Sequence, residues 1–328
     1  MSDSPTNSIA VLTSGGDAAG MNAAIRAVVR VAADRQLQVF GVRCGYTGLI
    51  AGDIFSLGPR DVGGIIGRGG TILGTTRCAQ IKSESGQAAA VQQLRQRAIN
   101  GLIVIGGNGS QSAAHALSER GLAVVGIAST IDNDLAGADP SLGFVTAVDV
   151  ALEAIDRLRV TAASHNRVFL VEVMGRDSGH LALAASIAGG AEACVIPESE
   201  IPPETVAAEI RAAYERGKSH AIVVVAEGAV YNAERLASYF REHAGRLGFE
   251  LRVTTLGHIQ RGGAPGMFDR MLATELGAVA VEHLAERRAG VLLGRLRGAI
   301  AATPLSKVVN VRKALSSNYL DLATLLAK

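Results

Sequence analysis

The chain contains no tryptophan, and aromatic residues make up only 4% of its 328 residues. Because bases and sugars stack on aromatic side chains, this scarcity argues against a carbohydrate-stacking or base-stacking protein. Net charge is also small, since 32 lysines and arginines face 30 acids without blocks of one sign. Nucleic-acid binders concentrate positive charge on one face, so we expect no nucleic-acid partner.

Cysteine and long apolar runs are scarce as well. The three cysteines form no CxxC pair, which favours reduced thiols in a cytoplasmic protein. No apolar run approaches the ~20 residues that cross a bilayer, and the polar first residues predict no signal peptide. Apolar residues still reach 48%, which excludes disorder as the main state. We therefore expect a cytoplasmic protein with no membrane partner.

Glycine, with 39 residues, is abundant, and many glycines follow short β-branched runs. These runs are continuously apolar, as is typical of strands buried on both faces of a parallel sheet. Alanine-rich stretches separate them, which predicts α/β layers. The expected strands are 9–13, 39–42, 102–105, 123–127, 168–173, 221–225 and 251–255, and the main expected helices are 21–33, 112–120, 146–163 and 206–216.

Two expected strands run into glycine-rich loops, at 14–20 and 106–110, that precede helices. Such a loop offers backbone N–H groups and the positive end of a helix dipole to a phosphate; a tight turn that uses glycine's backbone freedom is the alternative. The first loop does not read GxxxxGK[ST], which excludes a P-loop. A dehydrogenase fits poorly, because strand 123–127 ends in Ala128-Ser129, where a dinucleotide-binding site has an acid.

Thr130, Asp132 and Asp134 follow the expected strand 123–127. At the mouth of a parallel sheet, one carboxylate can accept a proton from a substrate hydroxyl. The other can help to place a hydrated Mg²⁺. A turn rich in Asp and Asn that caps the next helix is the alternative, but the position after a buried strand favours chemistry.

Further polar residues follow three later expected strands: Arg176, then Glu227, then His258 with Arg261. An arginine there can neutralise charge on a transferring phosphoryl group, and an acid can hold a sugar hydroxyl. His258 and Arg261, flanked by glycines and with Arg252 upstream, form a compact anion site. A surface ion pair or a core histidine would explain any one of them alone. Together they predict a nucleotide-dependent kinase acting on a sugar phosphate.

Eight motifs occur along the chain in one order. They are LTSGGDAAGMNAAIR, RGGTILGTTR, IGGNGS, TIDND, EAIDRLR, VEVMGR, IAGG and LGHIQRGG. In order and spacing the chain resembles the phosphofructokinases of the bacterial ATP-dependent type, over nearly its whole length. The resemblance implies two three-layer α/β/α domains with mostly parallel sheets. The larger, nucleotide-binding domain would comprise 1–143 plus 260–308, and the smaller, sugar-phosphate-binding domain 144–259 plus 309–328.

The resemblance also implies an activity: transfer of a phosphoryl group from MgATP to the 1-hydroxyl of fructose 6-phosphate, in glycolysis. It implies a homotetramer whose active sites lie between domains and are completed by a neighbouring subunit. The implied catalytic residues are Asp132 as base, Thr130, Arg77 and Arg176. The implied ATP contacts are Gly16, Arg77, Cys78, Asn108, Gly109 and Ser110, with Asn108 and Asp134 toward Mg²⁺. The implied sugar-phosphate contacts are Thr130, Asp132, Met174, Gly175, Arg176, Glu227, His258 and Arg261, with Arg167 and Arg252 supplied by the neighbour.

Several positions depart from the family pattern. Members that use ATP have Asp at position 108 and Gly at positions 113 and 129, where this chain has Asn108, Ala113 and Ser129. Relatives that use pyrophosphate carry Asp at the position of Gly109 and Lys at that of Ser129, and neither is present. A pyrophosphate-dependent enzyme and a catalytically silent subunit that binds sugar phosphate therefore stay open as alternatives.

The family's effector site is matched only in part. The matching residues are Arg26, Arg30, Arg159 and Lys218. Pro59 and Ser219 stand where bacterial members have basic residues. Since each lost cation removes a charge-assisted hydrogen bond, we expect a weak or altered response to ADP and phosphoenolpyruvate.

Overall fold

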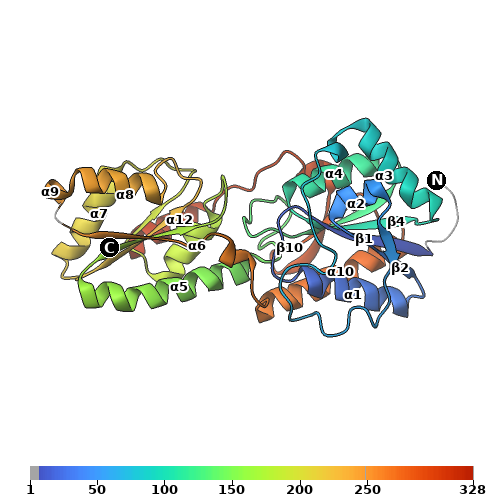
Figure 1. Ribbon diagram of the computed structural model, residues 1–328, viewed down its shortest axis with the longest axis horizontal. Helices are drawn as coiled ribbons and strands as arrows, with labels where there is room; N and C mark the ends of the chain where they lie inside the picture. Colours follow the sequence, from blue (N-terminus) through green and yellow to red (C-terminus); the bar gives the residue numbers. More distant parts are fainter. Residues whose placement is uncertain (1–6, 248, 328) are drawn as a thin grey trace. The chain divides into compact units, whose positions relative to one another are not determined.

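The computed structural model describes residues 7–247 and 249–327, and the chain divides into two compact units (Figure 1). Unit 1 comprises Met1–Ile131, Leu135–Val145 and Arg261–Lys313, and unit 2 comprises Asp132–Asp134, Thr146–Gln260 and Ala314–Lys328. The chain thus passes between the units near residues 145, 260 and 313, and on either side of Asp132–Asp134. The first three crossings lie one to five residues beyond the bounds expected from the resemblance, and the grouping of Asp132–Asp134 with unit 2 was not expected.

Unit 1 is built on a seven-stranded sheet with the order β11-β10-β5-β4-β1-β2-β3. Its parallel strands are β1 (Ser8–Ser14), β2 (Gln38–Val42), β4 (Gly101–Gly106), β5 (Ala123–Ala128) and β10 (Val291–Leu296). The edge strands β3 (Ile54–Ser56) and β11 (Ala299–Pro304) are antiparallel to their neighbours. Every residue of β1 and β4 is buried, which confirms the expectation from their continuous apolar runs.

Helices cover both faces of this sheet (Figure 1). They are α1 (Met21–Asp34), α2 (Gly45–Ala51), α3 (Glu84–Gln96), α4 (Asn108–Glu119), α10 (Met267–Ala285) and α11 (Leu305–Val308), with a 3₁₀ turn η1 (Gln80–Lys82). Helices α2, α3 and α4 share one apolar cluster with the sheet, while α1 and α10 pack against each other on the other face. Unit 1 therefore has three layers.

Unit 2 contains a four-stranded parallel sheet with the order β7-β8-β6-β9. The strands are β6 (Val168–Val173), β7 (Ala193–Val195), β8 (Ala221–Ala226) and β9 (Leu251–Thr255). Successive side chains of β8 point to opposite faces and all are buried, so both faces are covered. Its helices are α5 (Phe144–His165), α6 (His180–Gly189), α7 (Pro203–Glu215), α8 (Ala233–Glu242), α9 (Ala244–Leu247) and α12 (Ser317–Leu326), with a 3₁₀ turn η2 (Gly257–Arg261).

Two expectations are wrong in detail. The strand at 251–255 is not buried on both faces, because β9 lies at the sheet edge and most of its residues are half-buried or exposed. The helix expected at 112–120 begins at Asn108. Asn108, Gly109 and Ser110 therefore form the first turn of α4 rather than a loop before it, since Gly107 takes the extended N-cap position.

Gly277 allows α10 to pack closely on α1, because a Cβ there would lie 2.7 Å from the Ala24 carbonyl oxygen and 2.8 Å from the Ala27 Cβ. We expect Gly277→Ala to lower the free energy of unfolding in urea by about 1–3 kcal/mol through overpacking. Gly109→Ala is the matched control, since its Cβ meets no described atom within 4 Å and alanine favours a helix by up to ~1 kcal/mol. Equal effects of the two substitutions would contradict the packing argument.

Candidate active site

The two glycine loops of unit 1 lie side by side. Strands β1 and β4 pair in parallel, with Ser14 opposite Gly106 at their carboxyl ends. The Ser110 hydroxyl, from the first turn of α4, donates to the Ser14 carbonyl oxygen at 2.9 Å. Tyr46 donates in turn to the Ser110 carbonyl oxygen at 2.7 Å, and burial raises the pKa of this phenol, which keeps it a neutral donor.

The start of α4 is open to a ligand. Its N-cap, Gly107, is extended and cannot provide a side-chain cap. The Ser110 and Gln111 N–H groups donate to the Gly107 carbonyl oxygen at 3.0 Å, which leaves those of Asn108 and Gly109 at the start of the helix for an anion. A Cβ on Gly109 would meet no described atom within 4 Å. The turn therefore has the geometry of an anion site and free space beside Gly109.

Arg261 contacts the first glycine loop. Its Nη1 donates to the Asp17 carbonyl oxygen at 2.9 Å, and a Cβ on Gly16 would lie 2.2 Å from that nitrogen. Only glycine leaves room for the guanidinium there. The side chain that the resemblance assigns to sugar phosphate thus lies on the loop that it assigns to the nucleotide.

The resemblance also implies two ATP contacts at the end of the motif RGGTILGTTR, Arg77 and the adjacent Cys78. Arg77 is exposed and Cys78 is half-buried. The Cys78 side chain packs against the apolar cluster around α2 and α3. Its thiol is thus part of the packing of unit 1.

Asp132 and Arg176 face each other in unit 2. Asp132 is only 5% exposed, and its Oδ2 lies 3.7 Å from Arg176 Nε. Ser178 donates its hydroxyl to the Asp132 carbonyl oxygen at 3.1 Å. Thr130 groups with unit 1, where its carbonyl oxygen accepts from the Ser141 hydroxyl at 2.7 Å. The pair Asp132–Arg176 combines a buried carboxylate with a cation that remains half exposed.

The segment Met174–Arg176 after β6 is held by two side chains. Glu227, which follows β8, accepts the N–H groups of Gly175 at 3.3 Å and Arg176 at 2.9 Å with one oxygen. Gln260 of η2 accepts the Met174 N–H at 2.8 Å. Glu227 therefore lies beside the Arg176 backbone, while His258 is exposed on η2.

Arg167 and Arg252 share one carboxylate. Glu250 accepts from Arg167 Nε at 2.8 Å and from Arg252 Nη2. The hydrogen bond from Arg167 is the main reason why the pKa of Glu250 lies below its ordinary value. The structure thus brings together the two arginines that the sequence predicts as phosphate ligands.

The chain matches the family model "Phosphofructokinase" over residues 8–284. It belongs to the phosphofructokinase family. It is 51% identical over 321 residues to "ATP-dependent 6-phosphofructokinase 1" of Thermus thermophilus, covering 97% of this chain and 99% of that protein. It is 46% identical to the "ATP-dependent 6-phosphofructokinase" of Listeria monocytogenes, with the same coverage of both chains.

Solved structures of the family share the fold. A T-state phosphofructokinase of Pichia pastoris superposes with a TM-score of 0.87 at 35% identity, covering 94% of this chain and 36% of that longer one. A pyrophosphate-dependent phosphofructokinase of Marinobacter aquaeolei gives a TM-score of 0.87 at 21% identity, covering 98% and 91%. The second likeness shows the fold alone.

Two of the four residues matching the phosphofructokinase effector site are engaged within unit 2. Lys218 Nζ lies 2.7 Å from Oε1 of the buried Glu192. Arg159 donates to the Gly190 carbonyl oxygen at 3.0 Å. Arg26 and Arg30 lie on α1 of unit 1, so the structure places the four residues on separate units.

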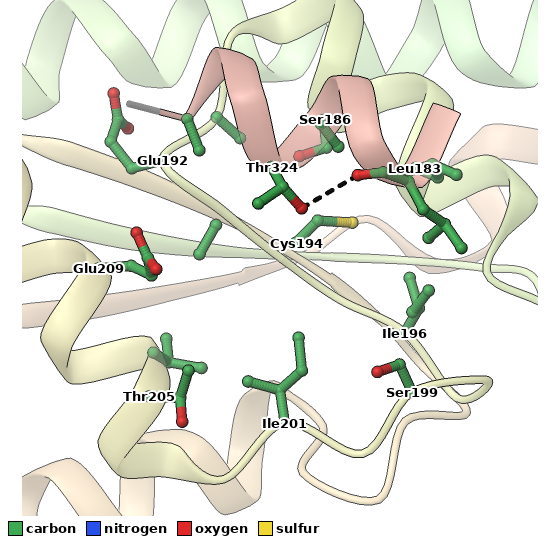
Figure 2. A pocket seen from close by; sticks show the side chains of 16 residues that line it. Leu183, Ser186, Glu192, Cys194, Ile196, Ser199, Ile201, Thr205, Glu209 and Thr324 are labelled. Carbon is green, nitrogen blue, oxygen red and sulfur yellow. Dashed lines mark hydrogen bonds between the residues drawn. The ribbon is translucent and has the colours of Figure 1, made fainter. Parts of the chain in front are cut away.

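Unit 2 also contains a cavity of about 370 Å³ next to α12, lined by none of the predicted site residues (Figure 2). Cys194 lies in its wall, and burial raises the pKa of this thiol to about 12. The thiol is thus protonated at neutral pH, the form that is a poor nucleophile.

Sequence reasoning missed the side chains that hold the loops from behind. Gln111 of α4 is fully buried, and its amide donates to carbonyl oxygens of Val104, Gly106 and Ile127, which joins the ends of β4 and β5. Thr75 donates to the Gly15 carbonyl oxygen at 2.7 Å. The only signal was their position, Thr75 inside the motif RGGTILGTTR and Gln111 directly after IGGNGS, because a side chain's partner is not encoded by spacing.

Glu250 partly neutralises Arg167 and Arg252, so we expect Glu250→Gln to tighten the binding of inorganic phosphate by about two- to fivefold, the scale of an exposed ion pair. A lowered carboxyl pKa means that the wild-type pairs are complete at neutral pH and weaken only as pH falls through that pKa. The difference between the two proteins should therefore disappear at acid pH. Calorimetric titration at two pH values measures this.

Weaker phosphate binding by Glu250→Gln at neutral pH would instead mean that the carboxylate holds the two arginines in place. Glu153→Gln is the matched control, because Glu153 pairs with the exposed Arg157 on α5 away from the predicted ligands.

Proposed function

We propose that this protein is an ATP-dependent 6-phosphofructokinase that phosphorylates the 1-hydroxyl of fructose 6-phosphate, giving fructose 1,6-bisphosphate and ADP in glycolysis. The observation that carries the proposal is the buried Asp132 carboxylate with the Arg176 guanidinium 3.7 Å away. It is supported by the names of relatives that match this chain from end to end.

Asp132 acts as the general base. It takes the proton of the 1-hydroxyl while that oxygen bonds to the γ-phosphorus and the bond to the bridging oxygen of ADP breaks. Arg176 stabilises the negative charge that spreads over the transferring group. Burial of the Asp132 carboxylate favours this role, because its electrostatic interaction with Arg176 strengthens where water is excluded.

Unit 1 binds the nucleotide. The N–H groups at the start of α4 and the loop around Gly16 hold its phosphates, with Ser110, Arg77 and the backbone at Cys78. Free space at Gly109 leaves room for a nucleoside, which favours ATP over pyrophosphate. The alternative of a silent subunit is disfavoured, because Asp132 and Arg176 are both kept and face each other.

Mg²⁺ fits the oxygen atoms that the chain offers. Asn108 and Asp134 would provide an amide oxygen and a carboxylate, and Mg²⁺ takes few protein ligands beside phosphates and water. In accord with this, no cluster of three or more His, Cys, Asp or Glu suited to a metal occurs in the described ranges. Held there, Mg²⁺ would neutralise charge on the nucleotide phosphates.

The acceptor is held chiefly by unit 2. Within unit 2, Met174, Gly175, Glu227 and His258 contact the sugar. The resemblance assigns Thr130 and Arg261 of unit 1 to the acceptor as well. Arg167 and Arg252 bind the 6-phosphate of a neighbouring subunit's substrate in a homotetramer.

This assembly is supported by β9, an edge strand that carries Arg252 and leaves Val253 43% exposed. Exposed edge strands tend to pair with another strand or to be covered.

We place the enzyme in the cytoplasm. Within the described residues, no helix has the length and hydropathy to span a membrane. Because Pro59 and Ser219 lack the charge of the family's effector ligands, control by ADP and phosphoenolpyruvate is weak.

A donor panel with fructose 6-phosphate tests the function. We expect turnover with MgATP and far less with pyrophosphate, and we expect Asp132→Asn to lower kcat by about 10²–10⁴-fold, the usual contribution of a general base. Asp156→Asn, at an exposed acid of α5, is the matched control. Faster turnover with pyrophosphate, or an Asp132→Asn variant with more than a tenth of wild-type activity, would refute the assignment.

Asn108 sets the metal requirement. An added carboxylate at this position should contribute ~1 kcal/mol to metal binding, so Asn108→Asp should lower the Mg²⁺ concentration for half-maximal rate about fivefold. Asn108→Ala removes the oxygen and should raise it. Rates over a Mg²⁺ titration at saturating ATP measure both, and no change in either variant would place the metal elsewhere.

A further inference from the structure

We propose that Gln260 is a positioning residue that fixes the segment Met174–Arg176 so that Arg176 faces Asp132. The inference rests on the proposed function and concerns a side chain outside the residues that touch substrate.

Gln260 is an internal residue of unit 2, with only 1% of its surface exposed. Its Oε1 accepts the Met174 N–H at 2.8 Å. Because an N–H group requires an acceptor, this contact fixes which end of the amide faces the segment. The Nε2 atom is consequently buried, with no hydrogen-bond partner among the described residues. Buried polar atoms without a partner are rare, and this one results from using the amide as an acceptor for Met174.

The segment requires such support. Gly175 has φ +142° and Arg176 has φ +51°, and a non-glycine residue in the left-handed region is strained. Glu227 holds the N–H groups of Gly175 and Arg176. A Cβ on Gly228 would lie 1.7 Å from the Arg176 carbonyl oxygen, so the backbone is confined on that side too. Gln260 provides the remaining contact, to the N–H group at the start of the segment.

Three successive N–H groups are thus held by two side chains from different elements. Each contact lies within unit 2 and leads along the backbone to the Arg176 side chain, whose Nε lies 3.7 Å from Asp132 Oδ2. Loss of the Gln260 contact frees the first residue of the segment and lets Arg176 leave that position. The transfer step then slows, whereas nucleotide binding by the loops of unit 1 is unchanged.

The test compares Gln260→Met with Gln260→Glu. Methionine has nearly the same shape but removes the acceptor oxygen, whereas glutamate keeps it. In steady-state kinetics with MgATP and fructose 6-phosphate, we expect Gln260→Met to lower kcat about 10- to 100-fold. Its KM for ATP should stay within twofold of wild type, and Gln260→Glu should keep kcat within about fivefold.

Unfolding in urea separates positioning from structural support. A merely structural glutamine would lower the unfolding midpoint and leave kcat per folded molecule at the wild-type value, which would overturn the inference. If Gln260→Met does not fold, Gln260→Asn, whose shorter side chain withdraws the oxygen, provides the same comparison. A wild-type protein without turnover would refute the proposed function itself, whereas wild-type kcat in the variants refutes only the role of Gln260.

Discussion

The parallel ladder of β1, β4 and β5 is the constraint on which unit 1 depends. The three strands are buried and paired in parallel, so that Ser14, Gly106 and Ala128 lie in one row at their carboxyl ends. The two glycine-rich segments expected to handle the donor's phosphates begin at this row. A slip of one residue in either pairing would exchange the side chains that pack against the two helix layers, so packing of the core also fixes the relative height of the two glycine loops.

Side chains that donate to or accept from backbone groups convert this row into defined loops. Ser110 joins the first loop to α4, and Gln111 joins the ends of β4 and β5. In unit 2, Glu227 and Gln260 do the same for the segment after β6. Such contacts matter because a loop of small residues has little apolar surface with which to fix itself, and an unpaired buried N–H costs ~1–3 kcal/mol.

Much of the architecture was predictable from local patterns. The apolar runs predicted β6 and β9 with the bounds that the structure has, and β1, β4, β5 and β8 to within a residue at either end. The glycine loops and the acids after β5 were found because strand ends in a parallel sheet are marked by abrupt changes of composition. The exposure of β9 was not predicted, since an edge strand and a central strand can have similar sequences and differ only in the number of neighbouring strands.

The sequence by itself determined the fold class, the family motifs and the residue types that handle phosphate, because each depends on local composition, order and spacing. Only the tertiary structure decided that Arg261 lies over Gly16, that Glu250 is shared by Arg167 and Arg252, and that Gln260 holds Met174. Gly16 and Arg261, for example, are far apart in the chain, and no periodicity encodes such a pairing. These contacts join distant segments, and their partners are fixed by how the layers pack rather than by any local preference.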